Sequence, residues 1–461
     1  MIGEWRGVVR RRAASLLSPL AIVVRRRAAS LLSPLAIPAF RRLWVADIVS
    51  LLGDWVGRIA LTALIYEQTQ SPAWAAAVTA VSLAGFVGIG QVLATLADRF
   101  GRITVMVVSD VLRAGLFAAM LISMPVVGLL VLAFLAGLAT PPFEAARAAA
   151  MPDLVPANRY GSALALAGIS VQSSLVLGTA LGGLLLAVFD VRAVLLLNSI
   201  SFLVSAVILF GLRDTAAARP AARRATVGGS LREGGSALFH DRMVRRALSI
   251  VCVAGAAGTV VEALIVPYAL SNDLSPPLLG LIAALVPIGT LFGTALVATG
   301  ARSDASLLRN AARCCVAAAG VAAPLFWLGA GGPLAFAAFL VTGGIFAVSI
   351  PSNQVIGLRL GRDHRASAMG IAVGLLMGSQ ALGAALGGLS ASAVGEAETM
   401  TGALVVATVF GLWALVTTPT DAKHLFRRRP SAATPSRVID LAALEDVAVV
   451  APDAPALSSP R

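Results

Sequence analysis

Leu96-Ala97-Asp98-Arg99-Phe100-Gly101-Arg102 places several charged side chains in a short turn, between apolar runs over roughly 73–95 and 104–123. Such a turn is typical of a loop held at one face of a membrane, because charges stay in water while apolar helices enter lipid. We therefore expect the rest of the chain to consist of spanning helices joined by loops of this kind.

The composition favours a bilayer over a soluble core. Of 461 residues, 58% are hydrophobic, 13% are charged and 44 are glycine, and the mean hydropathy is +0.88. A helix crosses the hydrocarbon layer in about 20 residues, and lipid offers no water to an unpaired backbone group, so long apolar runs without strand alternation are helices. The predicted fold class is an all-α integral membrane protein of twelve transmembrane helices in two pseudo-symmetric six-helix bundles.

Twelve apolar runs support this count, with six on each side of a polar, Arg-rich connector. We predict an N-terminal bundle over 40–212, a cytoplasmic linker over 213–246 and a C-terminal bundle over 247–419. The expected spans are roughly 43–66, 73–95, 104–123, 126–146, 162–188, 193–211, 247–270, 278–299, 311–330, 333–350, 366–394 and 400–418.

Two tails flank the predicted bundles. The first, 1–39, contains a tandem duplication in which VVRRRAASLLSPLAI occupies 8–22 and again 23–37. It is either a polybasic segment at anionic head groups or the product of a recent genetic duplication or of a start codon assigned too early. The second tail, 420–461, is Ala- and Pro-rich, and we predict that it is disordered because too little apolar surface repeats there to pack.

The distribution of basic residues predicts the orientation. If the amino terminus is inside, the inward segments hold 33 of the 36 Lys and Arg residues, and only Arg192 lies in an outward loop. This bias is the positive-inside pattern. We therefore predict a multi-pass protein of the cytoplasmic membrane with both termini in the cytoplasm. The net charge of +13 then needs no nucleic acid to explain it.

The two predicted halves share a faint internal repeat. Residues 177–184 read LGTALGGL and residues 382–389 read LGAALGGL, at an offset of 205 residues. Repeats of this size, related by an axis along the membrane normal, are typical of secondary transporters. Glycines in spanning helices let two backbones approach closely. We expect this role for Gly178, Gly182, Gly183, Gly383, Gly387 and Gly388.

Over about 38–420 the sequence resembles the major facilitator superfamily. The run Ala94-x-Leu96-Ala97-Asp98-Arg99-x-Gly101-Arg102 is similar to the family's signature between spans two and three, with Ala94 where the family usually has Gly. The runs PPFEAAR at 141–147 and MPDLVP at 151–156 resemble the twelve-span drug-efflux branch that includes macrolide and siderophore exporters. Thr179 stands where the antiporters of this superfamily have Pro.

Four ionisable residues inside the spans are candidates for a proton and substrate cavity. Asp47, Asp54 and Arg58 share one face of the first span, and Glu262 is the carboxylate of the second half's spans. Our hypothesis is that Arg58 and Glu262, at similar depth in pseudo-equivalent spans, pair across the halves when the outer side closes. The alternatives are an intrahelical Asp54–Arg58 pair and a Glu262 that lines the path without gating.

The resemblance implies an inner gate formed by Asp98, Arg99, Gly101, Arg102, Glu144 and Arg147. In the family picture Asp98 meets the amino end of span eleven, near Ser367, and Arg102 bridges to Glu144. A helix amino end attracts an anion, which makes that contact physically reasonable. The alternative is that the Arg-rich loop only anchors the topology. We interpret Asp110 and Arg113 as an intrahelical pair without a direct role in transport.

Other function classes fit the sequence less well. It has no phosphate-cradling Walker loop, no HExxH and no Gly-x-Ser-x-Gly, and Cys252, Cys314 and Cys315 lack metal-ligand spacing, so we predict neither an enzyme nor a cofactor or metal site. We predict a monomeric secondary active transporter in the lipid bilayer that exports a small hydrophobic or amphipathic compound in exchange for protons. The alternatives are an uptake symporter and a non-transporting scaffold or receptor.

Overall fold

The computed structural model describes residues 30–88, 92–93, 100–213, 235–236, 238–297, 303–328, 332–360 and 365–418. Within these ranges every long regular element is an α-helix, as predicted. The helices are α2 (Pro38–Thr69), α3 (Pro72–Ala84), α6 (Arg102–Ala119), α7 (Val126–Leu138), α8 (Thr140–Leu154), α9 (Ala157–Leu186), α10 (Val191–Phe210), α12 (Arg242–Ser271), α13 (Pro276–Val297), α14 (Asp304–Leu328), α15 (Pro333–Gly343), α16 (Ser349–Arg359), α17 (Arg365–Val394) and α18 (Glu396–Thr417). Two short 3-10 segments, η1 (Ser33–Ala36) and η3 (Gly344–Val348), complete them.

Ten helices in the described ranges are long and apolar enough to cross a membrane. α7 with α8, and α15 with η3 and α16, each count as one of them. α3 is shorter, with 13 residues, and α6 has 18 residues but carries Arg102, Asp110 and Arg113. The count of twelve spans therefore stays a prediction, while the all-helical membrane fold is confirmed.

Local sequence signals explain where several helices begin and end. α2 begins at Pro38, whose fixed φ suits a first helical turn, and ends before Gln70, which adopts a left-handed φ of 49°. Gly101, with φ 86°, precedes the start of α6, a conformation that favours glycine. The Asp190 carboxylate caps α10 by accepting a hydrogen bond from Ala193 N at 2.8 Å.

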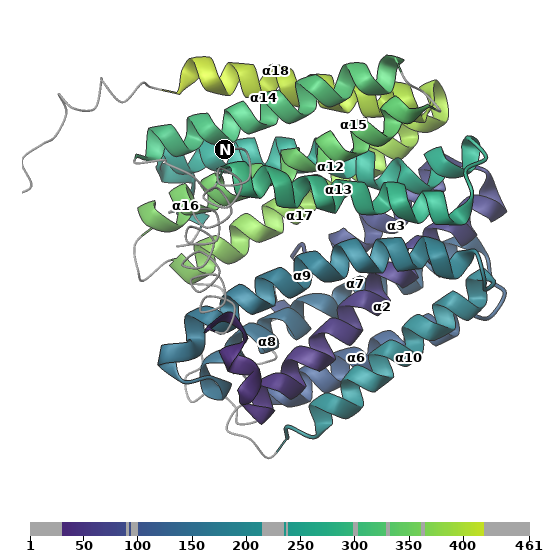
Figure 1. The fold of residues 1–461 in the computed structure, drawn as a ribbon, viewed down its shortest axis with the longest axis vertical. Helices are drawn as coiled ribbons and strands as arrows, with labels where there is room; N and C mark the ends of the chain where they lie inside the picture. The colour runs from purple at the N-terminus through teal and green to yellow at the C-terminus, as the bar shows by residue number, and fades with distance from the viewer. Residues whose placement is uncertain are drawn as a thin grey trace, which may run out of the picture. The chain divides into compact units, whose positions relative to one another are not determined.

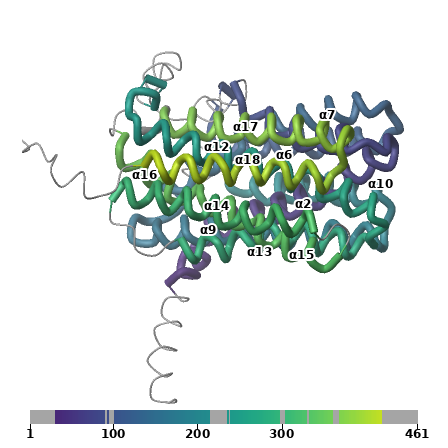
Figure 2. The backbone as a smooth tube through the Cα atoms, turned by 90° about the horizontal axis from the view of Figure 1, so that it is seen from above, coloured from purple at the N-terminus to yellow at the C-terminus, as the bar shows by residue number. Residues whose placement is uncertain are grey.

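The two halves of the chain pack in the same pattern. In the first half, α2 contacts α9 and α10, and α10 contacts α6; in the second, α12 contacts α17 and α18, and α18 contacts α14. Figure 1 shows the purple-to-teal helices of the first half beside the teal-to-yellow helices of the second, and Figure 2 shows the helices running alongside one another. The faint sequence repeat thus corresponds to a repeat of packing.

The bundle has two chemically different ends. We call the end at which α2 begins the basic end, because it carries Arg41, Arg42, Arg102, Arg159, Arg242, Arg245 and Arg359. The opposite end, where α2 stops, carries Glu67, Asp190, Asp273, Glu396 and Glu398. At this opposite end the two halves meet through α9 with α13 and through α3 with α17.

Candidate transport site

A cavity of about 360 Å³ lies between the two halves, lined by α2, α3 and α9 on one side and by α12, α13, η3, α16 and α17 on the other. A second cavity of about 250 Å³ meets the first around the side chains that line both, which are Trp55, Arg58, Thr79, Glu262, Met377 and Gln380. Most of the lining is aliphatic or aromatic. Such a space accepts an apolar molecule and leaves its few polar groups to orient it.

Arg58 is held from two sides within the first half. Its guanidinium lies 4.5 Å from the centre of the Trp55 ring, and its Nη2 lies 3.9 Å from Asp54 Oδ2. Asp54 and Arg58 are four residues apart on α2, so the expected intrahelical pair is present. The pair and the ring together neutralise and orient the cation that faces the cavity.

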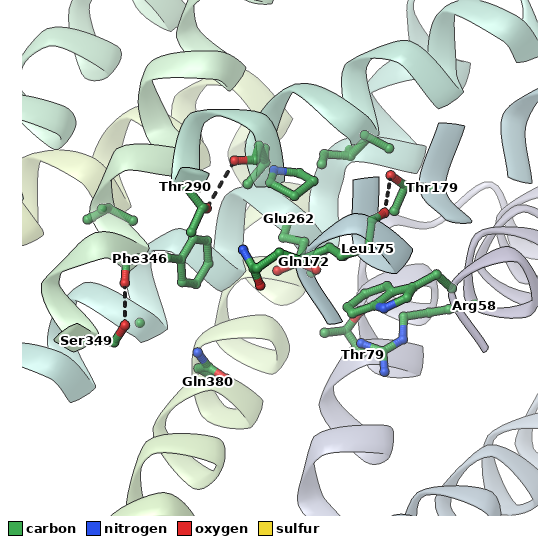
Figure 3. A pocket seen from close by; sticks show the side chains of 18 of the residues that line it. Arg58, Thr79, Gln172, Leu175, Thr179, Glu262, Thr290, Phe346, Ser349 and Gln380 are labelled. Atoms are coloured by element: carbon green, nitrogen blue, oxygen red, sulfur yellow. Dashed lines mark hydrogen bonds between the residues drawn. The ribbon is translucent and has the colours of Figure 1, made fainter. Parts of the chain in front are cut away.

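Glu262 enters both cavities from α12, in the second half. Figure 3 shows Glu262 and Gln172 near the centre of the view, with Arg58 and Thr79 on one side and Phe346 on the other. Arg58 and Glu262 thus line one cavity from opposite halves, but no ion pair within 4 Å joins them among the described residues. Over the two cavities together, Asp54 and Glu262 supply two carboxylates and Arg58 supplies one guanidinium group, so this lining carries one net negative charge when all three are ionised.

Asp47 lies away from the two large cavities. It is 4% exposed and packs beside Phe40, Trp44 and Met151 near the basic end. Its Oδ1 lies 3.5 Å from Arg147 Nε on α8. The structure therefore groups Asp47 with two residues predicted for the inner gate, Glu144 and Arg147, and not with Asp54 and Arg58.

Arg102 has a different partner from the one expected. Its guanidinium donates to the Asp153 carboxylate at the end of α8 and does not bridge to Glu144. Glu144 instead accepts from Arg147, whose Nε lies 3.2 Å from Glu144 Oε2. The expectation was wrong because residues three apart on one helix turn meet directly, which leaves Arg102 to reach the next acid along α8. Asp98, Arg99 and the side chain of Ser367 lie outside the described residues.

The predicted packing glycines lie where side chains would collide. A Cβ on Gly178 would lie 2.7 Å from Trp55 Cβ on α2, and one on Gly387 would lie 2.8 Å from Val260 Cγ1 on α12. A Cβ on Gly182 would likewise crowd Ile59 on α2, and one on Gly383 would crowd Ala256 on α12. Gly183 instead abuts Gly280 on α13, and a Cβ on Gly388 would lie 2.7 Å from Ala76 Cβ on α3. The equivalent glycines thus lie at equivalent interfaces, and Gly183 and Gly388 lie at two of the contacts between the halves.

Several polar residues of the cavity carried no clear signal in the sequence. Gln172, Gln380, Thr79, Thr290 and Ser349 line it, yet each is a single polar residue in an apolar run. Thr290 Oγ1 donates to Gly343 O at 2.9 Å and Ser349 Oγ to Phe346 O at 2.8 Å, so both are partly engaged by backbone. The spacing of Gln172 and Thr179, seven residues apart on one face of α9, is a signal that could have pointed to Gln172.

The basic end of the second half is held by a three-residue ion network outside the cavity. Arg359, at the end of α16, donates to Asp241 at 3.0 Å and to Asp304 at 2.6 Å. Burial favours the neutral acid at Asp241, but hydrogen bonds from Arg359 and from the backbone N–H groups of Met243 and Val244 outweigh it and hold the pKa of Asp241 below its usual value. This network ties together the ends of α12, α14 and α16.

Sequence comparison finds a relative with the same type of fold. Over 171 residues the chain is 31% identical to the uncharacterized MFS-type transporter YfiS of Bacillus subtilis (strain 168). The matched stretch takes in 37% of this chain and 41% of that relative. This relative therefore supports the type of protein without assigning a substrate.

Solved structures of transporters share the fold. A POT family transporter in complex with 5-aminolevulinic acid matches with a TM-score of 0.68 at 12% identity, over 83% of this chain and 96% of that one. A bacterial homolog to the human lysosomal transporter Spinster, inward-facing and unoccupied, matches with a TM-score of 0.63 at 15% identity, over 86% and 99%. Residues 43–373, most of the chain, match the family described as Major Facilitator Superfamily. The chain therefore belongs to the Major Facilitator Superfamily and is a membrane transporter of that type.

Proposed function

We propose that this protein exports a small amphipathic compound bearing one positive charge, in exchange for protons, by alternating access in the cytoplasmic membrane. The observation that carries the proposal is the cavity between the halves, in which Arg58 is paired within its own half and Glu262 is not. An apolar wall suits the body of such a compound, and Glu262 supplies the counter-charge.

Competition for Glu262 would couple the two fluxes. A buried carboxylate is stable when it holds either a proton or a cation, and it costs free energy when it holds neither. A proton entering from outside would displace the cationic substrate, and a substrate entering from the cytoplasm would displace the proton. Export as the direction rests on the likeness of residues 141–147 and 151–156 to the drug-efflux branch.

Contacts between the halves support alternating access. At the opposite end Gly183 abuts Gly280, and Ala73 N donates to Ser392 Oγ at 3.2 Å, so the two halves touch there. The cavity lies farther toward the basic end, against residues such as Gln172, Ser349 and Met377. Two proposed gates would open in turn. One consists of Arg58 and Glu262, and the other, toward the basic end, consists of Asp98, Arg99, Gly101, Arg102, Glu144 and Arg147.

The test is transport of a fluorescent lipophilic cation in proteoliposomes under an imposed pH gradient. Wild type should move the dye against the proton flux, and Glu262→Gln should reduce this gradient-driven rate about tenfold or more, since it removes the counter-charge. The matched control is Glu67→Gln, an exposed carboxylate at the opposite end of α2. Dye movement with the protons would indicate an uptake symporter, and indifference to the gradient would exclude proton coupling.

A further inference from the structure

Five ionisable side chains gather in the first half near the basic end, apart from the cavity. We call them the buried charge cluster, and they come from α2, α6 and α8. Three are carboxylates and two are guanidinium groups: Asp47, Asp110, Glu144, Arg113 and Arg147. With every group ionised the cluster would carry one negative charge too many.

One of the ion pairs in the cluster, Asp110 with Arg113, is supported by several neighbouring side chains. Arg113 donates to Asp110, which is fully buried and also accepts from Ser205 Oγ at 2.6 Å. The Arg113 guanidinium lies between two aromatic rings, 4.7 Å from the centre of Phe143 and 4.5 Å from that of Phe202. These contacts stabilise the Asp110 charge, while Arg113 Nε makes no hydrogen bond within the described part of the chain.

The other guanidinium is shared unequally between two carboxylates. Arg147 donates to Glu144 Oε2 from both Nε and Nη2. Asp47 Oδ1 lies only 3.5 Å from the same Nε, and it accepts no hydrogen bond within the described part of the chain. Because Asp47 is 4% exposed, water cannot stabilise its charge either. Asp47 is therefore the carboxylate of the cluster that lacks a cation of its own.

We propose that Asp47 is a second proton-binding site, distinct from the cavity, and that Arg147 changes partner from Glu144 to Asp47 when this proton leaves. The site itself follows from the cluster's contacts, and only its use in coupling rests on the proposed function. The described arrangement is then the protonated one, with Arg147 on Glu144. Loss of the proton would release Glu144, whose side chain is 34% exposed and can be solvated.

The surroundings of Asp47 contain few other groups that could exchange a proton with it. α8 contributes Glu144 and Arg147, and α6 contributes Asp110 and Arg113, which are paired with each other. α9 faces it with Ala167, and Ser170 of that helix accepts from Trp44 Nε1 at 2.8 Å. Asp47 is thus the carboxylate of the buried charge cluster whose protonation would disturb the fewest hydrogen bonds and ion pairs.

The proposed exchange has a path to the cavity. Glu144, Arg147 and Phe143 lie on α8, and this helix begins at Thr140, which lines the smaller of the two cavities. Thr140 is one turn from Glu144, so a movement of α8 that follows the change of partner reaches the cavity wall directly. Binding or loss of the Asp47 proton can therefore change the cavity wall through movement of α8, without a chain of charged residues between the two sites.

The experiment is an infrared difference titration of the full-length protein in lipid nanodiscs, without substrate. The signal is the carbonyl stretch of a protonated carboxylic acid, which disappears as that acid loses its proton at rising pH. We expect a wild-type component that is absent in Asp47→Asn and retained in Glu262→Gln. In Glu144→Gln, Arg147 is free to pair with Asp47, so the component should titrate about one pH unit lower.

Each result decides the proposal. A component that persists in Asp47→Asn, or that vanishes in Glu262→Gln alone, would overturn it. An unshifted component in Glu144→Gln would overturn the change of partner, and this variant keeps the test open if Asp47→Asn does not fold. Since the titration uses no substrate, the component can be present while dye transport fails, which would overturn only the proposed function.

Discussion

The two halves of the transporter share a packing pattern but not their buried chemistry. The contacts of Gly178 with Trp55 and of Gly383 with Ala256 give an offset of 201 residues between α2 and α12, which pairs Asp47 with Leu248. At the sequence offset of 205 residues, Asp110 pairs with Cys315, Arg113 with Ala318 and Arg147 with Ser352. In the first half these positions hold buried ion pairs. In the second half they are uncharged, and Cys315 Sγ donates to Ala407 O at 3.4 Å on α18, as Asp110 meets Ser205 on α10.

The difference shows that the scaffold packs without these charges. A buried ion pair often adds no stability over apolar side chains of similar size, so its presence in one half alone points to a function. The second half keeps its ionic contacts at the surface, in the network of Arg359, Asp241 and Asp304. The first half thus holds the buried charge cluster, and the second supplies Glu262.

The largest expected effect comes from replacing the buried Asp110–Arg113 pair of the first half by the uncharged residues of the second half. Arg113→Ala alone would leave Asp110 buried without its cation and should destabilise the protein by about 3 to 5 kcal/mol. The double variant Asp110→Cys with Arg113→Ala copies the uncharged pair of the second half and should recover most of that loss. Thermal unfolding followed by size-exclusion chromatography measures both. A double variant as unstable as the single one would break the comparison.

The interface glycines test whether the halves are equivalent in motion as well as in packing. Gly183→Val and Gly388→Val each place a side chain against the other half, and each should reduce dye transport about tenfold or more by preventing closure at the opposite end. Gly115→Ala is the matched control, because nothing lies within 4 Å of its added Cβ. Loss of transport in only one of the two valine variants would show that the interfaces are not equivalent.

A smaller, pH-dependent effect is expected at the surface network of the second half. Asp241 caps α12, so Asp241→Ala should cost about 1 kcal/mol at neutral pH. Because its pKa is lower in the folded state, this stabilisation is present above the unfolded value near pH 4 and is lost as the pH falls through the folded value. The difference in melting temperature between wild type and Asp241→Ala should therefore shrink in acid.

An acid-independent difference would mean that the Asp241 charge contributes nothing. Asp241→Asn separates the two contributions, since the amide oxygen can still cap the helix but does not attract Arg359 as a carboxylate does. The first half also has a surface pair, Arg102 with Asp153, whereas its Asp110–Arg113 pair is buried. This contrast would sharpen the difference between the two halves.

Much of the fold could be predicted from the sequence because hydrophobic length and charge position are local properties. The apolar runs, the repeat around Gly178 and Gly383, and the i, i+4 pair of Asp54 and Arg58 each follow from spacing along one chain segment. The family is confirmed, whereas the orientation and the count of twelve spans stay predictions.

Contacts between helices were harder to predict, because their register depends on small residues in two separate segments. Gly53 and Gly57 allow α2 to approach Ser201 and Asn198 of α10 so closely that no Cβ fits. This approach accompanies the placement of Ser50 and Ser205 beside Asp110. In the same way, the sequence alone does not show which turns of α2 and α6 meet which turns of α8, so the partners of Asp47 and Arg102 could not be assigned.

The 3-10 segment η3 would change the length of its span by a defined amount if it became α-helical. Its five residues, Gly344–Val348, separate α15 from α16, and Phe346 within it faces the cavity. A 3-10 helix rises about 2.0 Å per residue and an α-helix about 1.5 Å, so rewinding five residues would shorten this span by about 2.5 Å. The change from three to 3.6 residues per turn would also rotate α16 by about 100° relative to α15. Rewinding η3 would therefore shorten this span and rotate α16 in a single step, so that a different face of α16 would meet its neighbours.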